Sequence, residues 1–340
     1  MDSECQGIIG RPMRCTFFLA GEDLDALSRI DRDRDWRELQ TGERAWILQT
    51  WLLLYRAGHP VELSGTAPGD GLVVFHPRQK RLLLAQRSRL RDAVLVGTRA
   101  DYRQPLIADF EILQNSFYAD GRRRFWIPHW PQPGLVPRDP ARGERIERIA
   151  FKGFAANLHP GFREPEWAGF LAREGIEWIE DALAYAGRNR LDLEWPDFRT
   201  VDLVVAVRPN QKTTRHSKPP TKLFNAWLAG VPALLGPESA YRELRRSALD
   251  YLEVASVAEA KEAVLRLRRD PGLYRAMVDN GLRRRVEFTP EALVPRWADL
   301  LFETIPALAE RRPRLTRRLP LPVRAAGRWL ARTFTLRPAK

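Results

Sequence analysis

Short apolar runs alternate with longer segments of helical character along most of the 340 residues. The run that constrains the fold most is VDLVVAVR, residues 201–208, which is apolar over nearly its whole length. Such a strand is expected to be buried on both faces, as in a parallel sheet covered by helices on each side. Strands that alternate with helices therefore predict an α/β fold with parallel sheets.

The alternation runs through the whole chain and is interrupted once. The other predicted strands lie at residues 16–20, 60–63, 71–75, 93–97, 125–128, 148–154, 176–180, 231–236 and 251–254. Predicted helices cover residues 43–57, 166–173, 222–229, 257–269, 270–288 and 290–303.

The interruption is PQPGLVPRDPARGE, residues 131–144, whose prolines, glycines and charges are typical of a linker. A chain of this length can form two domains, each with its own core. We expect a first domain at residues 1–135, a linker at 136–145, a second domain at 146–306 and a tail at 307–340. Met13 directly precedes the first predicted strand, so residues 1–12 are expected to be an extension with no role in the fold.

Two lysines lie at an unusual place in KPPTKLFNAWLAGVPALLG, residues 218–236. Helix N-termini carry a partial positive charge and favour acidic residues, yet Lys218 and Lys222 flank the start of this predicted helix. Thr221 is expected to cap the helix, and Arg208 ends the preceding strand. In open parallel sheets ligands bind beyond the carboxyl ends of the strands, so this cluster predicts a phosphate or diphosphate site.

The stretch SKPPTKLFNAWLAGVPALLG, followed by PESAYREL, resembles the nucleotide-sugar signature of glycosyltransferases of the group 1 or family 4 type. The resemblance covers residues 148–305 best and is thinner in the first half. It implies a GT-B architecture, in which two Rossmann-like domains face each other across a cleft. It also implies a nucleotide-diphospho-sugar donor, with Arg208 and Lys222 as the basic pair that contacts its diphosphate.

The chain departs from the family pattern at two positions. The family often has two glutamates there, and this chain has Ser217 and Asn225. By the resemblance, Asn225 would hydrogen-bond a sugar or ribose hydroxyl, and Glu238 in the next loop would replace the missing carboxylate. The predicted donor site therefore comprises Arg208, Lys218, Thr221, Lys222, Asn225 and Glu238.

A catalytic base, if the reaction needs one, is expected from the first domain. Asp101 and His129 each follow a predicted strand, and His76 is a third option. The sequence does not choose among them, since a loop aspartate is usually a turn residue and a lone histidine is more often packed. No DxD-type acidic pair lies in a convincing strand-end context, and DRDRD, residues 31–35, contains the letters in a solvated charged stretch, so we predict no metal and no cofactor beyond the nucleotide-sugar substrate.

The net charge of +13 is concentrated in the tail, because residues 311–340 contain nine arginines, one lysine and no acid. Thirteen minus ten leaves +3 for the body, which argues against a specific nucleic-acid partner. In the tail Arg324, Arg328 and Arg332 are four apart, while Val323, Leu330 and Phe334 fall on the other side of a helix. This pattern predicts peripheral binding to an anionic membrane surface, with a disordered charged terminus as an equal alternative.

The sequence thus favours a glycosyltransferase that acts on a glycan or lipid-linked acceptor, in surface polysaccharide or glycolipid synthesis. A nucleotide-sugar epimerase or a phosphorylase on the same fold is the alternative, and an epimerase would convert the free nucleotide sugar without an acceptor. The longest apolar stretch, AWILQTWLLLY, is interrupted by Gln49 and is too short to span a membrane. With no convincing signal peptide and only two cysteines, a cytoplasmic location is expected.

Overall fold

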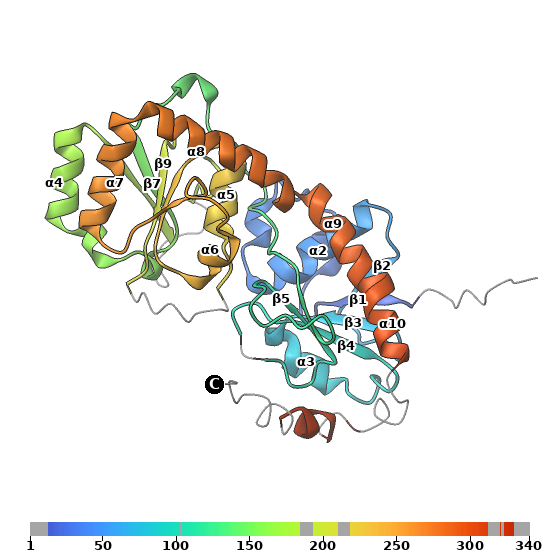
Figure 1. The fold of residues 1–340 in the computed structure, drawn as a ribbon. Helices are drawn as coiled ribbons and strands as arrows, with labels where there is room; N and C mark the ends of the chain where they lie inside the picture. The colour runs from blue at the N-terminus through green and yellow to red at the C-terminus, as the bar shows by residue number, and fades with distance from the viewer. Residues whose placement is uncertain are drawn as a thin grey trace, which may run out of the picture.

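Figure 1 shows a computed structural model of the chain, in which residues 13–102, 104–183, 193–209, 218–311, 320 and 323–329 are described. The described strands form one sheet of six strands and one of five. Every pairing between them is parallel. The predicted parallel α/β architecture is therefore confirmed.

The six-stranded sheet has the order β2-β1-β3-β4-β5-β6. Its strands are β1 (Cys15–Phe18), β2 (Val61–Ser64), β3 (Leu72–Phe75), β4 (Val94–Thr98), β5 (Phe110–Leu113) and β6 (Arg124–Trp126). All but β5 were predicted to within about three residues. The short β5 has a buried charged residue, Glu111, in its middle, so its sequence does not form a continuous apolar run.

Two apolar clusters lie on the faces of this sheet. One includes α2 (Gln49–Arg56), which continues a π-helical turn at Arg44–Leu48, and the other includes Leu83 of α3 (Lys80–Ala85). The short α1 (Leu24–Ser28) adds Leu27 to the first cluster. The ends of β3 and β4 are thereby fixed between packed helices.

The five-stranded sheet has the order β11-β10-β9-β7-β8. Its strands are β7 (Arg148–Phe154), β8 (Glu177–Leu183), β9 (Leu203–Ala206), β10 (Ala233–Leu235) and β11 (Leu252–Glu253). All five were predicted. On one face pack α4 (Pro165–Glu174), α7 (Val257–Arg269) and α8 (Pro271–Arg284), and on the other α5 (Thr221–Ala229) and α6 (Ser239–Leu244).

The last helices return to the first sheet (Figure 1). They are α9 (Pro290–Ala298), a π-helical turn at Asp299–Thr304 and α10 (Ile305–Glu310). Their apolar side chains, with Trp297 fully buried, belong to the same cluster as those of β1 and α2. This differs from the expected second domain at residues 146–306, because residues 290–306 complete the core of the first.

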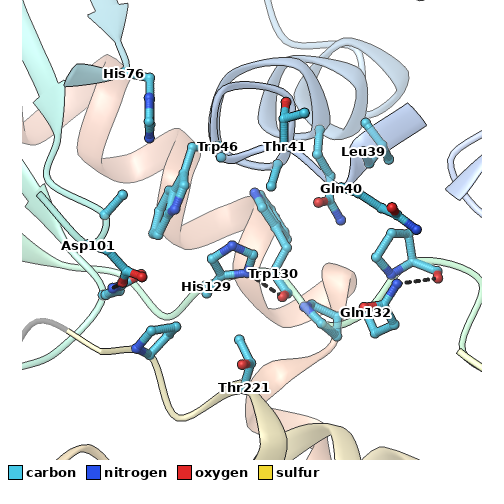
Figure 2. A pocket seen from close by; sticks show the side chains of 18 of the residues that line it. Leu39, Gln40, Thr41, Trp46, His76, Asp101, His129, Trp130, Gln132 and Thr221 are labelled. Atoms are coloured by element: carbon cyan, nitrogen blue, oxygen red, sulfur yellow. Dashed lines mark hydrogen bonds between the residues drawn. The ribbon is translucent and has the colours of Figure 1, made fainter. Parts of the chain in front are cut away.

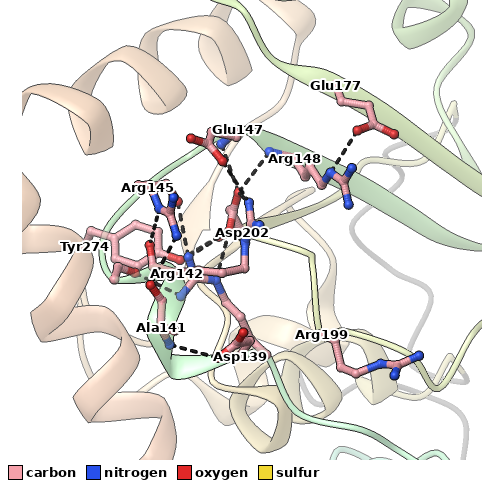
Figure 3. A network of polar contacts seen from close by, with 12 residues as sticks. Asp139, Ala141, Arg142, Arg145, Glu147, Arg148, Glu177, Arg199, Asp202 and Tyr274 are labelled. Carbon is pink, nitrogen blue, oxygen red and sulfur yellow. Dashed lines mark hydrogen bonds and ion pairs between the residues drawn. The ribbon is translucent and has the colours of Figure 1, made fainter.

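The linker is tied to the second domain by one buried carboxylate, Asp202, directly before β9 (Figure 3). Its oxygens accept hydrogen bonds from Arg138 at 2.7 and 3.0 Å and from Arg142 at 2.7 and 2.8 Å. The backbone N–H groups of Glu147 and Arg148 each add one at 2.9 Å. Six donors thus converge on one side chain and fix the linker against the strand.

A short helix at residues 323–329 lies against the first domain. Arg324 and Arg328 both form ion pairs with Asp109, and Arg328 also donates to the carbonyls of Leu106 and Ile107. These two arginines were predicted to face an anionic membrane surface, but in the structure they contact the protein, because the buried Asp109 pairs with them. Arg332, Leu330 and Phe334 lie outside the described residues. No helix within the described ranges has the length and apolarity needed to span a membrane.

Candidate functional site

Two adjoining cavities lie where the two domains meet. The larger cavity has a volume of about 470 Å³ and is lined mainly by the first domain, and the smaller cavity, of about 240 Å³, is lined mainly by the second. They share a wall of residues from both domains, namely Asp101, Gln132, Phe154, Trp195, Pro219, Thr221 and Asn225. A ligand in one cavity would therefore lie beside a ligand in the other.

Lys222 is one of four cationic residues that line the smaller cavity. Its Nζ donates to the carbonyl of Lys152 and lies 5.0 Å from the centre of the Phe151 ring. Gly153, at φ +150°, leaves space for this ammonium group, since a Cβ there would overlap the Nζ. Residues at the end of β7 thus hold the lysine of α5 in place.

The surroundings of Lys222 are unfavourable for its charge. Burial, and then the nearby Arg208, lower the pKa of Lys222 to about 8. A diphosphate bound in this cavity would place negative charge beside Lys222 and would raise this pKa again. The arrangement is therefore suited to an anion.

Arg208 is another cationic residue of the smaller cavity. Its Nε donates to Glu238 at 2.8 Å, and its Nη1 donates to the amide oxygen of Asn157. The other carboxylate oxygen of Glu238, Oε1, is buried and has no hydrogen-bond partner among the described residues. Glu238 therefore orients Arg208 in this structure, and its role as a direct donor ligand stays a prediction.

The remaining predicted donor residues connect the two domains. Lys218 forms an ion pair with Asp101 at 2.6 Å, and its carbonyl accepts a bond from Asn115 at 2.8 Å. The amide oxygen of Asn225 accepts from the backbone N–H of Gln132 at 3.1 Å. Lys218 and Asn225 therefore both form contacts between the domains. Ser217 lies outside the described residues.

Thr221 lines both cavities, but it does not cap α5 as the sequence suggested. Pro220 occupies the N-cap position and no side chain caps the helix, because Thr221 is already its first helical residue. The first N–H groups of α5 therefore lack a side-chain acceptor at the end of the helix that carries Lys222. Such unpaired N–H groups favour anions.

His129 lies in the larger cavity between the tryptophans of the first domain and Thr221 of the second (Figure 2). Its Nδ1–H donates to the carbonyl of Trp130 at 2.7 Å, so a neutral ring has its lone pair on Nε2. Burial lowers the pKa of His129, which keeps the ring neutral at physiological pH. A neutral imidazole with a free lone pair can act as a general base.

The support of His129 is rigid. Its ring packs edge-on against Trp46 with 4.8 Å between ring centres. The indole N–H of Trp130 donates to Thr50 at 2.8 Å, and the Thr50 hydroxyl donates to the carbonyl of Trp46 at 2.7 Å. Trp130 also stacks on Trp297 of α9 at 6.1 Å. Four packed residues thus determine where the imidazole points.

Asp101 lies at the junction of the cavities and is engaged on both carboxylate oxygens. Lys218 binds one oxygen and the amide of Gln114 donates to the other at 2.8 Å. The preceding Ala100 has a positive φ of 46°, which is strained for a residue other than glycine. Of the two predicted bases, His129 has a lone pair available on Nε2, whereas each carboxylate oxygen of Asp101 already has a partner.

His76, the third option for a base, lines the larger cavity. Four other lining residues were not predicted as site residues, namely Gln40, Trp46, Gln49 and Trp130. The sequence offered one signal, the polar Gln49 inside an apolar helical stretch. Within the described ranges, no three His, Cys, Asp or Glu side chains form a cluster that could bind a metal ion.

No protein-family model and no curated protein sequence matches this chain. Among solved structures, an α1,3-fucosyltransferase superposes with a TM-score of 0.52 and 10% identity, over 89% of this chain and 92% of that one. HepE from Anabaena, in complex with UDP and glucose, superposes with a TM-score of 0.50 and 13% identity, over 85% and 99%. At such identities the likeness concerns the fold, and it confirms the GT-B architecture of two Rossmann-like domains across a cleft.

Proposed function

We propose that this protein is a glycosyltransferase that transfers a sugar from a nucleoside-diphosphate sugar to an acceptor hydroxyl. The observation that carries the proposal is the pair of adjoining cavities, with Lys222 and Arg208 among the residues of one and the neutral His129 among those of the other. The complex of HepE with UDP and glucose, on the same fold, supports a nucleotide-sugar donor.

The residues have distinct roles in the proposed reaction. The Nε2 of His129 takes the proton of the acceptor hydroxyl, and the hydroxyl oxygen forms a bond to the anomeric carbon of the donor sugar. The bond from that carbon to the diphosphate breaks, and its electron pair leaves with the nucleoside diphosphate. Lys222, Arg208 and the N-terminus of α5 stabilise the developing negative charge.

The donor site is tested by replacing Lys222 with methionine. This change removes a poorly solvated charge, so we expect the free energy of unfolding to rise on the order of 2 kcal/mol at pH 7. The pKa of Lys222 is lower in the folded protein than in the unfolded chain, so this gain is complete below the folded pKa of about 8 and disappears as the pH rises toward 10.5. The measurement is thermal unfolding with and without UDP, GDP, ADP and dTDP.

In wild type, one nucleotide at about 100 times its Kd should stabilise the protein by roughly 2.7 kcal/mol, and this shift should be lost in Lys222→Met. Lys80→Met, at an exposed lysine of α3, serves as the control and should keep the full shift. The donor site is refuted if all three proteins respond alike, or if no nucleotide shifts the wild type.

We also propose that transfer needs no metal ion. Lys222 and Arg208 already supply positive charge where the diphosphate leaves, and such positioned cations can stabilise a leaving group without a metal. Activity that is unchanged in EDTA supports this, and activity restored only by Mg²⁺ or Mn²⁺ refutes it.

We propose further that the acceptor is a glycan or lipid-linked glycan at an anionic membrane surface, in surface polysaccharide or glycolipid synthesis. Two features support this: residues 311–340 contain ten basic residues and no acid, and the exposed fractions of Val323 and Trp329 are 51% and 54%. A basic segment with exposed apolar side chains binds anionic lipids through its charge and through the apolar area that it buries in the membrane.

This proposal predicts that the full chain sediments with phosphatidylglycerol vesicles at low salt and not with phosphatidylcholine vesicles. Deleting residues 312–340 should abolish the binding. Equal sedimentation of the full and shortened chains would show that the tail is not the attachment.

A further inference from the structure

Unpaired polar atoms gather on the first-domain wall of the larger cavity. They are Nε2 of His76, Nε2 of Gln49 and both amide atoms of Gln40, all buried and without a hydrogen-bond partner among the described residues. The whole side chains of His76 and Gln49 are buried, with exposed fractions of 0% and 1%. A buried polar group without a partner is costly, so several in one wall indicate a ligand that completes them.

The hydrogen bond at Nδ1 of His76 determines which ring nitrogen can donate to that ligand. Its Nδ1 accepts the backbone N–H of Arg78 at 3.4 Å, so a neutral ring has its proton on Nε2. Burial lowers the pKa of His76 to about 4, which keeps the ring neutral. Figure 2 shows the ring pointing into the cavity, so Nε2–H is a donor aimed at the ligand.

The rest of the wall is aromatic and nearly neutral. Trp46 and Trp130 line it with His129. The one arginine, Arg78, is paired with Glu43 at 3.5 Å and donates to the hydroxyl of Tyr102. The one carboxylate on the cavity, Asp101, is paired with Lys218. No described lining residue thus brings an uncompensated charge for a phosphate or carboxylate ligand.

A polyhydroxylated, uncharged ligand fits this wall. Hydroxyl groups both donate and accept, which matches the one amide oxygen and the three donor nitrogens left unpaired, and a sugar ring has an apolar face for tryptophan. Resting on the proposed glycosyltransferase function, we propose that the acceptor unit is an uncharged sugar and that His76, Gln40 and Gln49 bind its hydroxyl groups in the larger cavity. His129, in the same cavity, would then face the hydroxyl that reacts.

The test is direct binding without a donor, measured by saturation-transfer NMR and titration. The probes are methyl glycosides of glucose, galactose, mannose, rhamnose, fucose and N-acetylglucosamine, beside glucuronate, galacturonate, glucose 6-phosphate and mannose 6-phosphate. We expect saturable binding of at least one uncharged glycoside, at least tenfold tighter than that of any anionic probe. Tighter binding of an anionic probe, or binding of none of the uncharged ones, overturns the proposal.

Two variants test the assigned donor. His76→Phe keeps a ring but removes Nε2–H, and we expect roughly tenfold weaker sugar binding, as for the loss of one hydrogen bond. Gly42→Ala leaves the imidazole intact and places a methyl group 3.2 Å from Nε2, so it should weaken binding similarly. His59→Phe is the matched control, because His59 stacks on Phe302 outside the cavity and should keep wild-type affinity.

The thermal shift with nucleotide is measured on the same proteins. A retained shift in His76→Phe shows that the variant is folded, so a loss of sugar binding then belongs to the missing donor. Equal sugar affinities of His76→Phe and His59→Phe overturn the assignment. If the nucleotide shift persists while no uncharged sugar binds, this inference fails and the proposed function stands.

Discussion

Replacing His129 with glutamine is expected to lower kcat by a factor of about 10²–10⁴, the usual contribution of a positioned general base. Glutamine can still donate an N–H toward the Trp130 carbonyl, but it has no basic lone pair to take the acceptor proton. The catalytic form of His129 is neutral, and burial lowers the pKa of His129. The kcat/KM of the wild type should therefore fall with acid only below the ordinary histidine pKa of 6.5. The measurement is the initial rate of nucleoside diphosphate release over a range of acceptor concentrations, which gives kcat and kcat/KM, against pH.

The same assay distinguishes His129 from Asp101. Asp101→Asn removes a partly exposed ion pair with Lys218, whose contribution to stability is small, and leaves the imidazole in place. We expect its kcat to stay within about tenfold of wild type. A larger loss in Asp101→Asn than in His129→Gln would make the aspartate the base and refute the assignment. The nucleotide-induced thermal shift should persist in both variants, since neither residue is assigned to the diphosphate.

Replacing Asp202 with asparagine is expected to lower the free energy of unfolding of the second domain by roughly 3–5 kcal/mol. The change removes the negative partner of Arg138, whose exposed fraction is only 8%, and leaves its charge buried. Although burial alone would raise the pKa of Asp202, the bonds from Arg142, the Glu147 backbone and Arg138 hold it below the usual value of 3.8. This stabilisation is therefore present at neutral pH and disappears as the pH falls through the lowered pKa.

Urea unfolding at pH 7 measures the effect, and Asp197→Asn is the matched control. Asp197 forms an ion pair with the exposed Arg199 at 2.6 Å, so its loss should change the free energy of unfolding by less than about 1 kcal/mol. Equal destabilisation by the two substitutions would mean that the six bonds to Asp202 do not act as a buried network.

The strands of the second sheet could be predicted because their burial requires apolar runs, as in residues 201–208. That Arg208, Lys218 and Lys222 lie in one cavity could be predicted because the two lysines belong to one short stretch and Arg208 follows the preceding strand β9 by two residues. His129 and His76 were named as candidate bases, but their grouping with Gln40 in one wall could not be predicted, because these residues lie on separate segments that only the folded first domain brings together.

Two other differences have local physical causes. Strand β5 has only four residues and includes Glu111, and its place is determined by pairing with β4 and β6 on either side. The cap expected at Thr221 is absent because the helix begins at Thr221 itself, after Pro220. In the first case, pairing with the neighbouring strands determines the structure. In the second, the helix begins one residue earlier than its sequence pattern predicts.

The return of α9 and α10 to the first sheet imposes an order on biosynthesis. Domains usually begin to fold as they leave the ribosome, N-terminal segments first. Here the first domain emerges first but must wait for Trp297, Leu301 and Ile305 to fill its core, after every strand of the second domain has been made. The part of the chain that carries His129 is therefore the first to be synthesised and the last to be finished.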